Sequence, residues 1–98
     1  MKPYRDYDES LMEALADPAE AAAYLSAALE EDDPALFLHA LAKVVRARGV
    51  AETADQAGLN RVSLYKMLSE TGNPELRSIE KILHVLGLKL KVEVEEEA

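Results

Sequence analysis

The sequence predicts an all-α fold of five to six short helices followed by one short C-terminal β-strand. Three observations favour this class. Apolar residues recur at helical spacing in several segments of the 98-residue chain, an Asp-Pro helix start occurs twice, and strict apolar–charged alternation is confined to residues 88–94. Because chains of roughly 100–150 residues usually form one domain, we expect residues 1–98 to form a single domain.

The first two helices are predicted from their apolar spacing and start signals. Residues 9–15 carry apolar side chains at 11, 12 and 15, which form one helical face. Asp17-Pro18 is a stronger signal, because an aspartate can accept from free backbone N–H groups and a proline at the first helical position has no N–H to leave unpaired. The alanine-rich run that continues to Leu29 has high helix propensity.

A second Asp-Pro pair, Asp33-Pro34, starts the next predicted helix. Gly49 is expected to follow its end in a left-handed conformation. Residues 50–59 predict a short helix that ends at Gly58, and Asn60 is expected to cap a further helix that continues to about Ser69. The apolar stripe of the helix that starts at Pro34 consists of Leu36, Phe37, Ala40, Leu41, Val44 and Val45.

The last helix and the strand are adjacent. Gly87 ends the helix, and residues 88–94 then alternate between apolar and charged side chains, which predicts a strand with one apolar face. Since a lone strand cannot pair its own backbone groups and the sequence predicts no second strand, we expect its partner to lie outside the chain. The stripe of the last helix is Leu76, Ile79, Ile82, Leu83 and Leu86.

Charge divides the chain into three parts. The total is -8, from 19 acidic and 11 basic side chains. Residues 1–33, an acidic helical N-terminal extension, hold ten acids and two bases, whereas residues 34–91, which include the core at 34–87, hold nine bases and five acids. Residues 88–98 form the strand and an acidic tail. The acidic ends either keep the protein soluble or meet a basic partner.

Several function classes are disfavoured by composition. Without cysteine the chain has no thiol nucleophile, disulfide or zinc–thiolate site, and His39 and His84 lie far apart in sequence. The run 30–33 lacks the alternate spacing of a calcium loop. We therefore expect no enzyme activity, no cofactor and no metal site. No apolar run approaches the 20 or so residues of a membrane span, and residues 1–6 lack the apolar core of a signal peptide, so we expect a cytoplasmic protein with no membrane partner.

Residues 50–68 match the requirements of a helix-turn-helix. Such a motif needs a small residue in its first helix, a residue that tolerates positive φ in the turn, an apolar residue directly after the turn and two buried positions in the second helix. The matching residues form the predicted framework: Ala54, Gly58, Leu59, Leu64 and Met67.

The second helix of this motif carries side chains suited to a DNA major groove. Arginine can bond a guanine edge, an apolar group can contact a thymine methyl, and hydroxyl groups can bond phosphate. The interpretations left open are that Tyr65 only packs on a neighbour, that Lys66 is an ordinary solvated lysine, and that Arg61 pairs with a nearby acid. The predicted DNA-binding residues are Asn60, Arg61, Val62, Ser63, Tyr65, Lys66 and Ser69.

A resemblance to a known family covers nearly the whole chain. The segments 46–50, 59–69, 72–74 and 82–88 resemble the addiction-module antidote proteins, as do Asp17-Pro18 and residues 22–25, 27–30 and 33–38. These are HigA-like antitoxins of type II toxin–antitoxin systems, with a Cro/C1 (lambda repressor-like) helix-turn-helix. The chain departs from the family pattern at Thr53, where an apolar residue is commoner.

The resemblance implies an antitoxin that neutralises a RelE/ParE-like toxin and represses its own operon as a homodimer. On this interpretation the acidic residues 1–33, alone or together with the acidic tail, dock on a basic toxin surface, and toxin binding improves DNA binding by masking acid. The partner of the strand is left open between a second copy and the toxin. The alternative function is a stand-alone helix-turn-helix regulator, or a protein-binding adaptor without a toxin.

Overall fold

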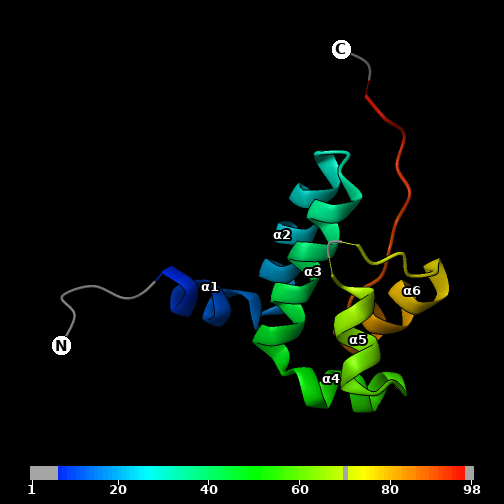
Figure 1. Cartoon of the computed structure of the whole chain (residues 1–98). Coiled ribbons are helices and arrows are strands. Elements are labelled where there is room, and N and C mark those ends of the chain that lie inside the picture. The colour runs from blue at the N-terminus through cyan, green and yellow to red at the C-terminus, as the bar shows by residue number, and fades with distance from the viewer. Residues whose placement is uncertain (1–6, 70, 97–98) are drawn as a thin grey trace.

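The computed structural model describes residues 7–69 and 71–96, and this part of the chain contains six helices (Figure 1). The all-α class predicted from the sequence is confirmed. The remaining residues, including residues 1–6 of the predicted acidic extension and residues 97–98 of the predicted tail, lie outside the described part. The helices are α1 (Tyr7–Leu15), α2 (Pro18–Glu30), α3 (Pro34–Arg48), α4 (Val50–Ala57), α5 (Arg61–Met67) and α6 (Leu76–Val85).

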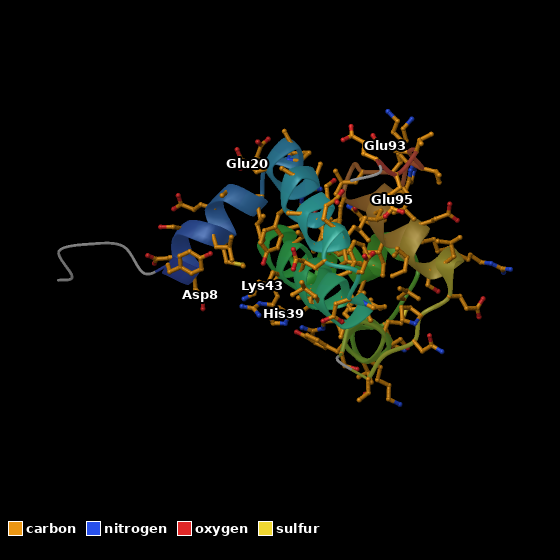
Figure 2. The ribbon with its side chains drawn as sticks, turned by 90° about the horizontal axis from the view of Figure 1, so that it is seen from above. Asp8, Glu20, His39, Lys43, Glu93 and Glu95 are labelled. Atoms are coloured by element: carbon orange, nitrogen blue, oxygen red, sulfur yellow. The ribbon has the colours of Figure 1, made fainter. Side chains whose placement is uncertain are left out.

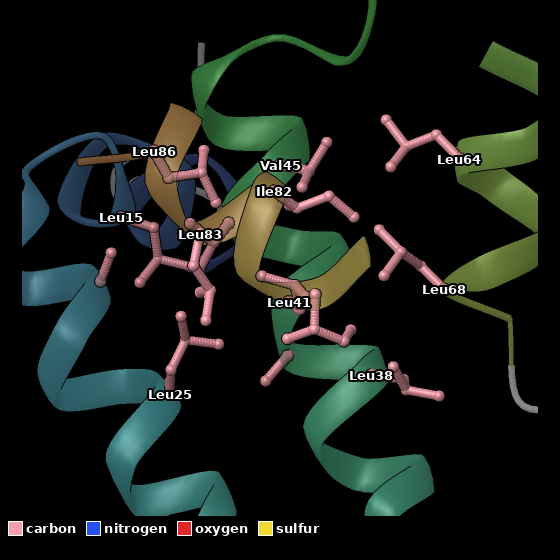
Figure 3. Packing of buried hydrophobic residues seen from close by; sticks show 14 of the residues in the cluster. Leu15, Leu25, Leu38, Leu41, Val45, Leu64, Leu68, Ile82, Leu83 and Leu86 are labelled. Carbon is pink, nitrogen blue, oxygen red and sulfur yellow. The ribbon is translucent and has the colours of Figure 1, made fainter. Parts of the chain in front are cut away.

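Helix α3 is the central element, because both α1 and α2 pack against it and α4 continues from its end. It buries residues at helical spacing, among them Leu38, Leu41 and Val45 (Figure 3). From α2, Leu25 lies on the same core, and from α1, Leu15 does so. The acidic N-terminal segment is therefore packed into the hydrophobic core through its described helices.

The remaining helices complete the same hydrophobic cluster. Helix α4 contacts α3, α5 and α6, and α6 contributes the fully buried Ile82 together with Leu83 and the following Leu86 (Figure 3). The guanidinium Nη2 of Arg48 donates to the carbonyl oxygen of Leu86 at 3.2 Å. This bond joins the last residue of α3 to the C-terminal end of α6, so the two helices that flank α4 and α5 are held together.

The helix starts show which local signals act as expected. The carboxylate of Asp33 accepts from the N–H of Ala35 at 3.1 Å, as predicted for a cap. Asp17 occupies the corresponding position before Pro18, but its side chain accepts no helix hydrogen bond, so the predicted side-chain cap is wrong there. The proline alone marks that start, since it leaves no N–H to satisfy. Gly49 has the positive φ, 120°, expected between α3 and α4, but its ψ of 116° lies outside the left-handed helical region that the sequence predicts.

The β-strand predicted over residues 88–94 is not formed within the described part of the chain. Residues 88–96 run as an extended segment away from α6 (Figure 1), and no residue of the described part is assigned to a strand. The physical reason is that a strand is defined by bonds to a neighbouring strand, and none of the described elements offers one. The alternation of side chains predicted the extended backbone but could not provide its partner.

In the described ranges, no helix has the length and apolar character needed to cross a membrane.

Candidate nucleic-acid interface

The turn between α4 and α5 has the geometry that the sequence predicts. Gly58 lies in the left-handed region at φ 72° and ψ 30°, a conformation that glycine adopts without a Cβ penalty. The N–H of Leu59 donates to the carbonyl of Ala54 at 2.8 Å, and that of Gly58 donates to Asp55 at 3.1 Å. These bonds close the end of α4 as in a Schellman motif. Ala54 is 2% exposed, so the small residue of the predicted framework is buried.

Two leucines fix α5 to the rest of the molecule. Leu64 is 1% exposed and Leu68 is 7% exposed, and both point toward the core (Figure 3). Of the two buried positions predicted, Leu64 is buried, whereas Met67 is half-buried against the cluster. Leu68 was missed, although it lies one helical turn after Leu64 and its N–H donates to the Leu64 carbonyl at 3.2 Å. The predicted Leu59 is also half-buried against the cluster.

The opposite face of α5 is open to solvent. Arg61 and Lys66 are exposed, and the apolar surfaces of Val62 and Tyr65 are 68% and 58% exposed. Leu64 and Leu68 bury the other side of the helix, so most of the surface of Val62 and Tyr65 stays open to a ligand. The face therefore presents two cations and two apolar groups together, which is the chemistry that reads base edges and phosphates in a major groove.

The polar residues at the two ends of α5 are engaged in the helix itself. The side chain of Asn60 accepts from the N–H of Ser63 at 2.8 Å, which confirms the predicted cap. The hydroxyl of Ser69 donates to the carbonyl of Lys66 at 2.9 Å. Since a hydroxyl has one proton, Ser69 can donate to a phosphate only by giving up this bond. Ser63 is half-buried, so Asn60 is the more accessible of the predicted polar residues at the start of α5.

Arg46 lies beside this face and was not among the predicted site residues. Arg46, Tyr65 and Ser69 line one hollow of about 230 Å³ between α3 and α5, and Arg46 is exposed. The sequence could not indicate this position, because nothing local shows that the end of α3 lies next to α5. Tyr65 therefore borders α3 as well as solvent, while Arg46 adds a third cation to the edge of the face.

Thr53 departs from the apolar pattern of the motif and is fully buried in α4 at 0% exposure. Its hydroxyl has no hydrogen-bond partner among the described residues. A buried polar group without a partner is costly, so this side chain weakens the framework of the motif. The sequence showed that Thr53 departs from the family pattern, but it could not show that the side chain is fully buried.

Acidic side chains gather away from α5. Figure 2 shows Asp8 and Glu20 on α1 and α2, and Glu93 and Glu95 on the C-terminal segment. Glu93 and Glu95 line a hollow together with Glu30 and Asp32, at the C-terminal end of α2. On α2, burial raises the pKa of the Tyr24 phenol, and the charge of the Tyr7 phenolate raises it further. The two ends of the sequence thus both contribute acid to the molecular surface.

The two histidines are exposed on different helices, His39 on α3 and His84 on α6. Among residues 7–69 and 71–96, no group of three or more potential metal ligands is formed. The described part of the chain therefore offers no assembled metal site around either histidine.

Comparison with known proteins gives a family for this arrangement. The family described as "Probable addiction module antidote protein" matches residues 5–94. The chain belongs to this antidote family. It is also 38% identical over 89 residues to a Haemophilus influenzae protein described as uncharacterized, covering 91% of this chain and 90% of that protein. No solved structure matches.

The antidote family match extends over every described helix and most of the extended C-terminal segment. It therefore includes both the exposed face of α5 and the acidic surface of α1 and α2. This bears out the resemblance found from the sequence, and it gives the chain a toxin as the general class of partner, as the word antidote implies.

Proposed function

We propose that the chain is an antitoxin that binds its own operator DNA through α5 as a homodimeric repressor and neutralises a RelE/ParE-like toxin. The observation that carries the DNA part is the face formed by Arg61, Val62, Tyr65 and Lys66. These side chains are exposed on a helix that Leu64 and Leu68 pack against the core. The turn before it has the positive φ of Gly58 that helix-turn-helix motifs of the Cro/C1 type require.

The toxin part is supported by the family and by the distribution of charge. A toxin that acts on RNA needs a basic surface, and an acidic partner can cover such a surface with electrostatically steered association. Residues 1–33 carry a net charge of -8, and Glu9 and Glu20 on α1 and α2 are exposed. Toxin bound there masks acid, so the complex should bind DNA more tightly than the antitoxin alone.

The DNA part is tested by gel shift with the upstream operator and three variants. Lys66→Ala should weaken binding to all sequences and lower the salt slope by about 1. Arg61→Ala should relax base preference and cost about 1–3 kcal/mol of binding free energy. Lys81→Ala is the matched control, because it removes the same charge from an exposed position on α6. Unchanged affinity for both α5 variants would remove the groove assignment.

The toxin part is tested by co-expression with the neighbouring reading frame. Copurification of the two proteins and rescue of growth support the antitoxin. Glu20→Lys should weaken the complex, whereas Glu80→Lys, an equal charge reversal at an exposed position on α6, should not. Failure of both copurification and rescue, with operator binding intact, would leave a stand-alone regulator in place of the antitoxin.

A further inference from the structure

The extended C-terminal segment, residues 88–96, leaves the core with an unpaired backbone. Leu88 packs against the hydrophobic cluster, and its N–H donates to the carbonyl of Leu83 at 2.8 Å. Beyond it, residues 89–96 make no backbone hydrogen bond to any residue that the structure describes. Val92 and Val94 are 96% and 94% exposed. Free N–H and C=O groups on an extended chain are a template for another strand, and the two valines lack an apolar cover.

The chain's own body disfavours holding the end of this segment. Glu93 and Glu95 share a hollow with Glu30 and Asp32, at the C-terminal end of α2. Like charges at close range repel one another, so the acidic end of the segment gains nothing electrostatic by lying against α2. A complementary partner for this segment must supply an extended edge, apolar side chains and positive charge together.

A second copy of this segment meets all three requirements. It is extended and carries exposed valines. Its first half also holds Lys89 and Lys91, which complement Glu93 and Glu95 in the second half. We propose that residues 88–96 pair with the same segment of a second copy as an antiparallel two-stranded ribbon, with Val92 on the two-fold axis. This inference rests on the homodimer of the proposed function and deepens it, by naming the surface and the register.

In that register all the cross-strand pairs between residues 89 and 95 are favourable. Lys91 lies opposite the second copy's Glu93, and Lys89 opposite the second copy's Glu95. On the other face, Val92 meets its own copy and Leu90 meets the second copy's Val94. Directly opposite side chains in an antiparallel pair are close enough to interact, so the ribbon has one charged face with four ion pairs and one apolar face.

Other registers and directions lose these pairs. An axis on Lys91 places that lysine opposite itself, and an axis on Leu90 places Lys89 opposite the second copy's Lys91. A parallel in-register pair sets lysine beside lysine and glutamate beside glutamate. Charge therefore selects the axis at Val92. An isolated two-stranded ribbon is only marginally stable, so contacts with the helices must support this one. Leu88 packs against the hydrophobic cluster. Leu29 of α2 is 48% exposed and lines the same hollow as Leu90, so it offers a second apolar contact.

The register is tested with two single-cysteine variants. The chain has no cysteine of its own, so any disulfide must come from the introduced residue. Residues on the axis have Cα atoms about 4.5–5.5 Å apart, within the range of a disulfide. Val92→Cys should therefore form a covalent dimer under mild oxidation. Val94→Cys is the matched control: it has the same residue type and exposure, but its copies would be offset by about 13 Å along the ribbon. Equal cross-linking of both variants would overturn the register.

The ion pairs are tested by charge reversal in sedimentation equilibrium, with neither DNA nor toxin present. Lys91→Glu and Glu93→Lys should each raise the dissociation constant of the dimer about tenfold, because each alters two symmetric pairs. The double variant restores both pairs, so its dissociation constant should return to that of the unmodified chain. This rescue is expected only where residue 91 lies opposite residue 93.

The outcomes separate this inference from the proposed function. A dimer that is insensitive to the single reversals would overturn the ribbon while leaving the homodimer in place. A chain that stays monomeric alone, with residues 88–96 protected from hydrogen exchange only in a toxin complex, would overturn the ribbon and assign the segment to the toxin. Operator binding and toxin neutralisation are measured separately and are decided by neither result.

Discussion

Replacing Thr53 by valine should stabilise the protein. Thr53 is fully buried and its hydroxyl has no partner among the described residues. Valine has nearly the same shape, the same branching at Cβ and a similar helix propensity. The substitution therefore exchanges an unsatisfied hydroxyl for a methyl group without opening a cavity.

The magnitude follows from the burial. Leaving a buried donor or acceptor unpaired costs about 1–3 kcal/mol, so Thr53→Val should raise the free energy of unfolding by about 1 kcal/mol or more. For a domain of this size that corresponds to a rise in Tm of about 4–8 °C. Thr53→Ser keeps the hydroxyl and removes the methyl, so it should lower the free energy of unfolding by about 0.8 kcal/mol.

Urea and thermal unfolding of the three proteins measure this order of stability. An unchanged denaturant slope is needed to show that the native and unfolded states are otherwise the same. Thr71→Val is the control, because it makes the same substitution at an exposed position. A loss of stability in Thr53→Val would refute the reasoning, since it would show that the hydroxyl has a hydrogen bond in solution.

Two further predictions concern the loop after α5 and the alkaline limb of stability. Gly72→Ala should lower the free energy of unfolding in urea by about 1–3 kcal/mol, because a Cβ there would lie 2.8 Å from the Lys66 carbonyl oxygen and contact the Met67 backbone. A Cβ at Gly58 would meet no atom within 4 Å. Gly58→Ala should therefore cost only about 1 kcal/mol, for its positive φ. A smaller loss at Gly72 than at Gly58 would contradict this. Burial raises the pKa of Tyr24, so its contribution to stability is present below pH 10 or so and is lost as pH rises through the folded-state pKa. Tyr24→Phe should flatten this alkaline loss in unfolding measured from pH 8 to 11, and an unchanged slope would argue against it.

The sequence predicted those features that depend on neighbouring residues. Gly58 and Asn60 have the conformation and the cap expected of them, and Asp33 caps α3, because each of these roles is decided within a few residues. Asp17 shows the limit of such rules. Its backbone is extended at the start of α2, yet its carboxylate does not turn to the helix, and no sequence pattern states which rotamer a solvated side chain takes.

What the sequence could not predict depends on contacts between distant segments. Arg46 joins the face of α5 only because α3 ends beside it, and Arg48, two residues later, is directed instead to the carbonyl of Leu86. The strand predicted at 88–94 is not formed within the described part of the chain, for a related reason. Alternation describes one side of a pairing, and the other side is not in the described part of the chain.

The order in which the helices pack has a consequence for how fast the protein forms. Helices α1, α2 and α3 contact one another, α3 contacts α4, and α4 contacts α5, so most of the core joins segments that are neighbours in the chain. The contact of α6 with α4 and the hydrogen bond from Arg48 to Leu86 join segments that lie further apart in the chain. Helical domains dominated by local contacts fold in about microseconds to milliseconds. The face of α5 should therefore be assembled almost as soon as the chain is released from the ribosome, well before a slower second-order association between two copies.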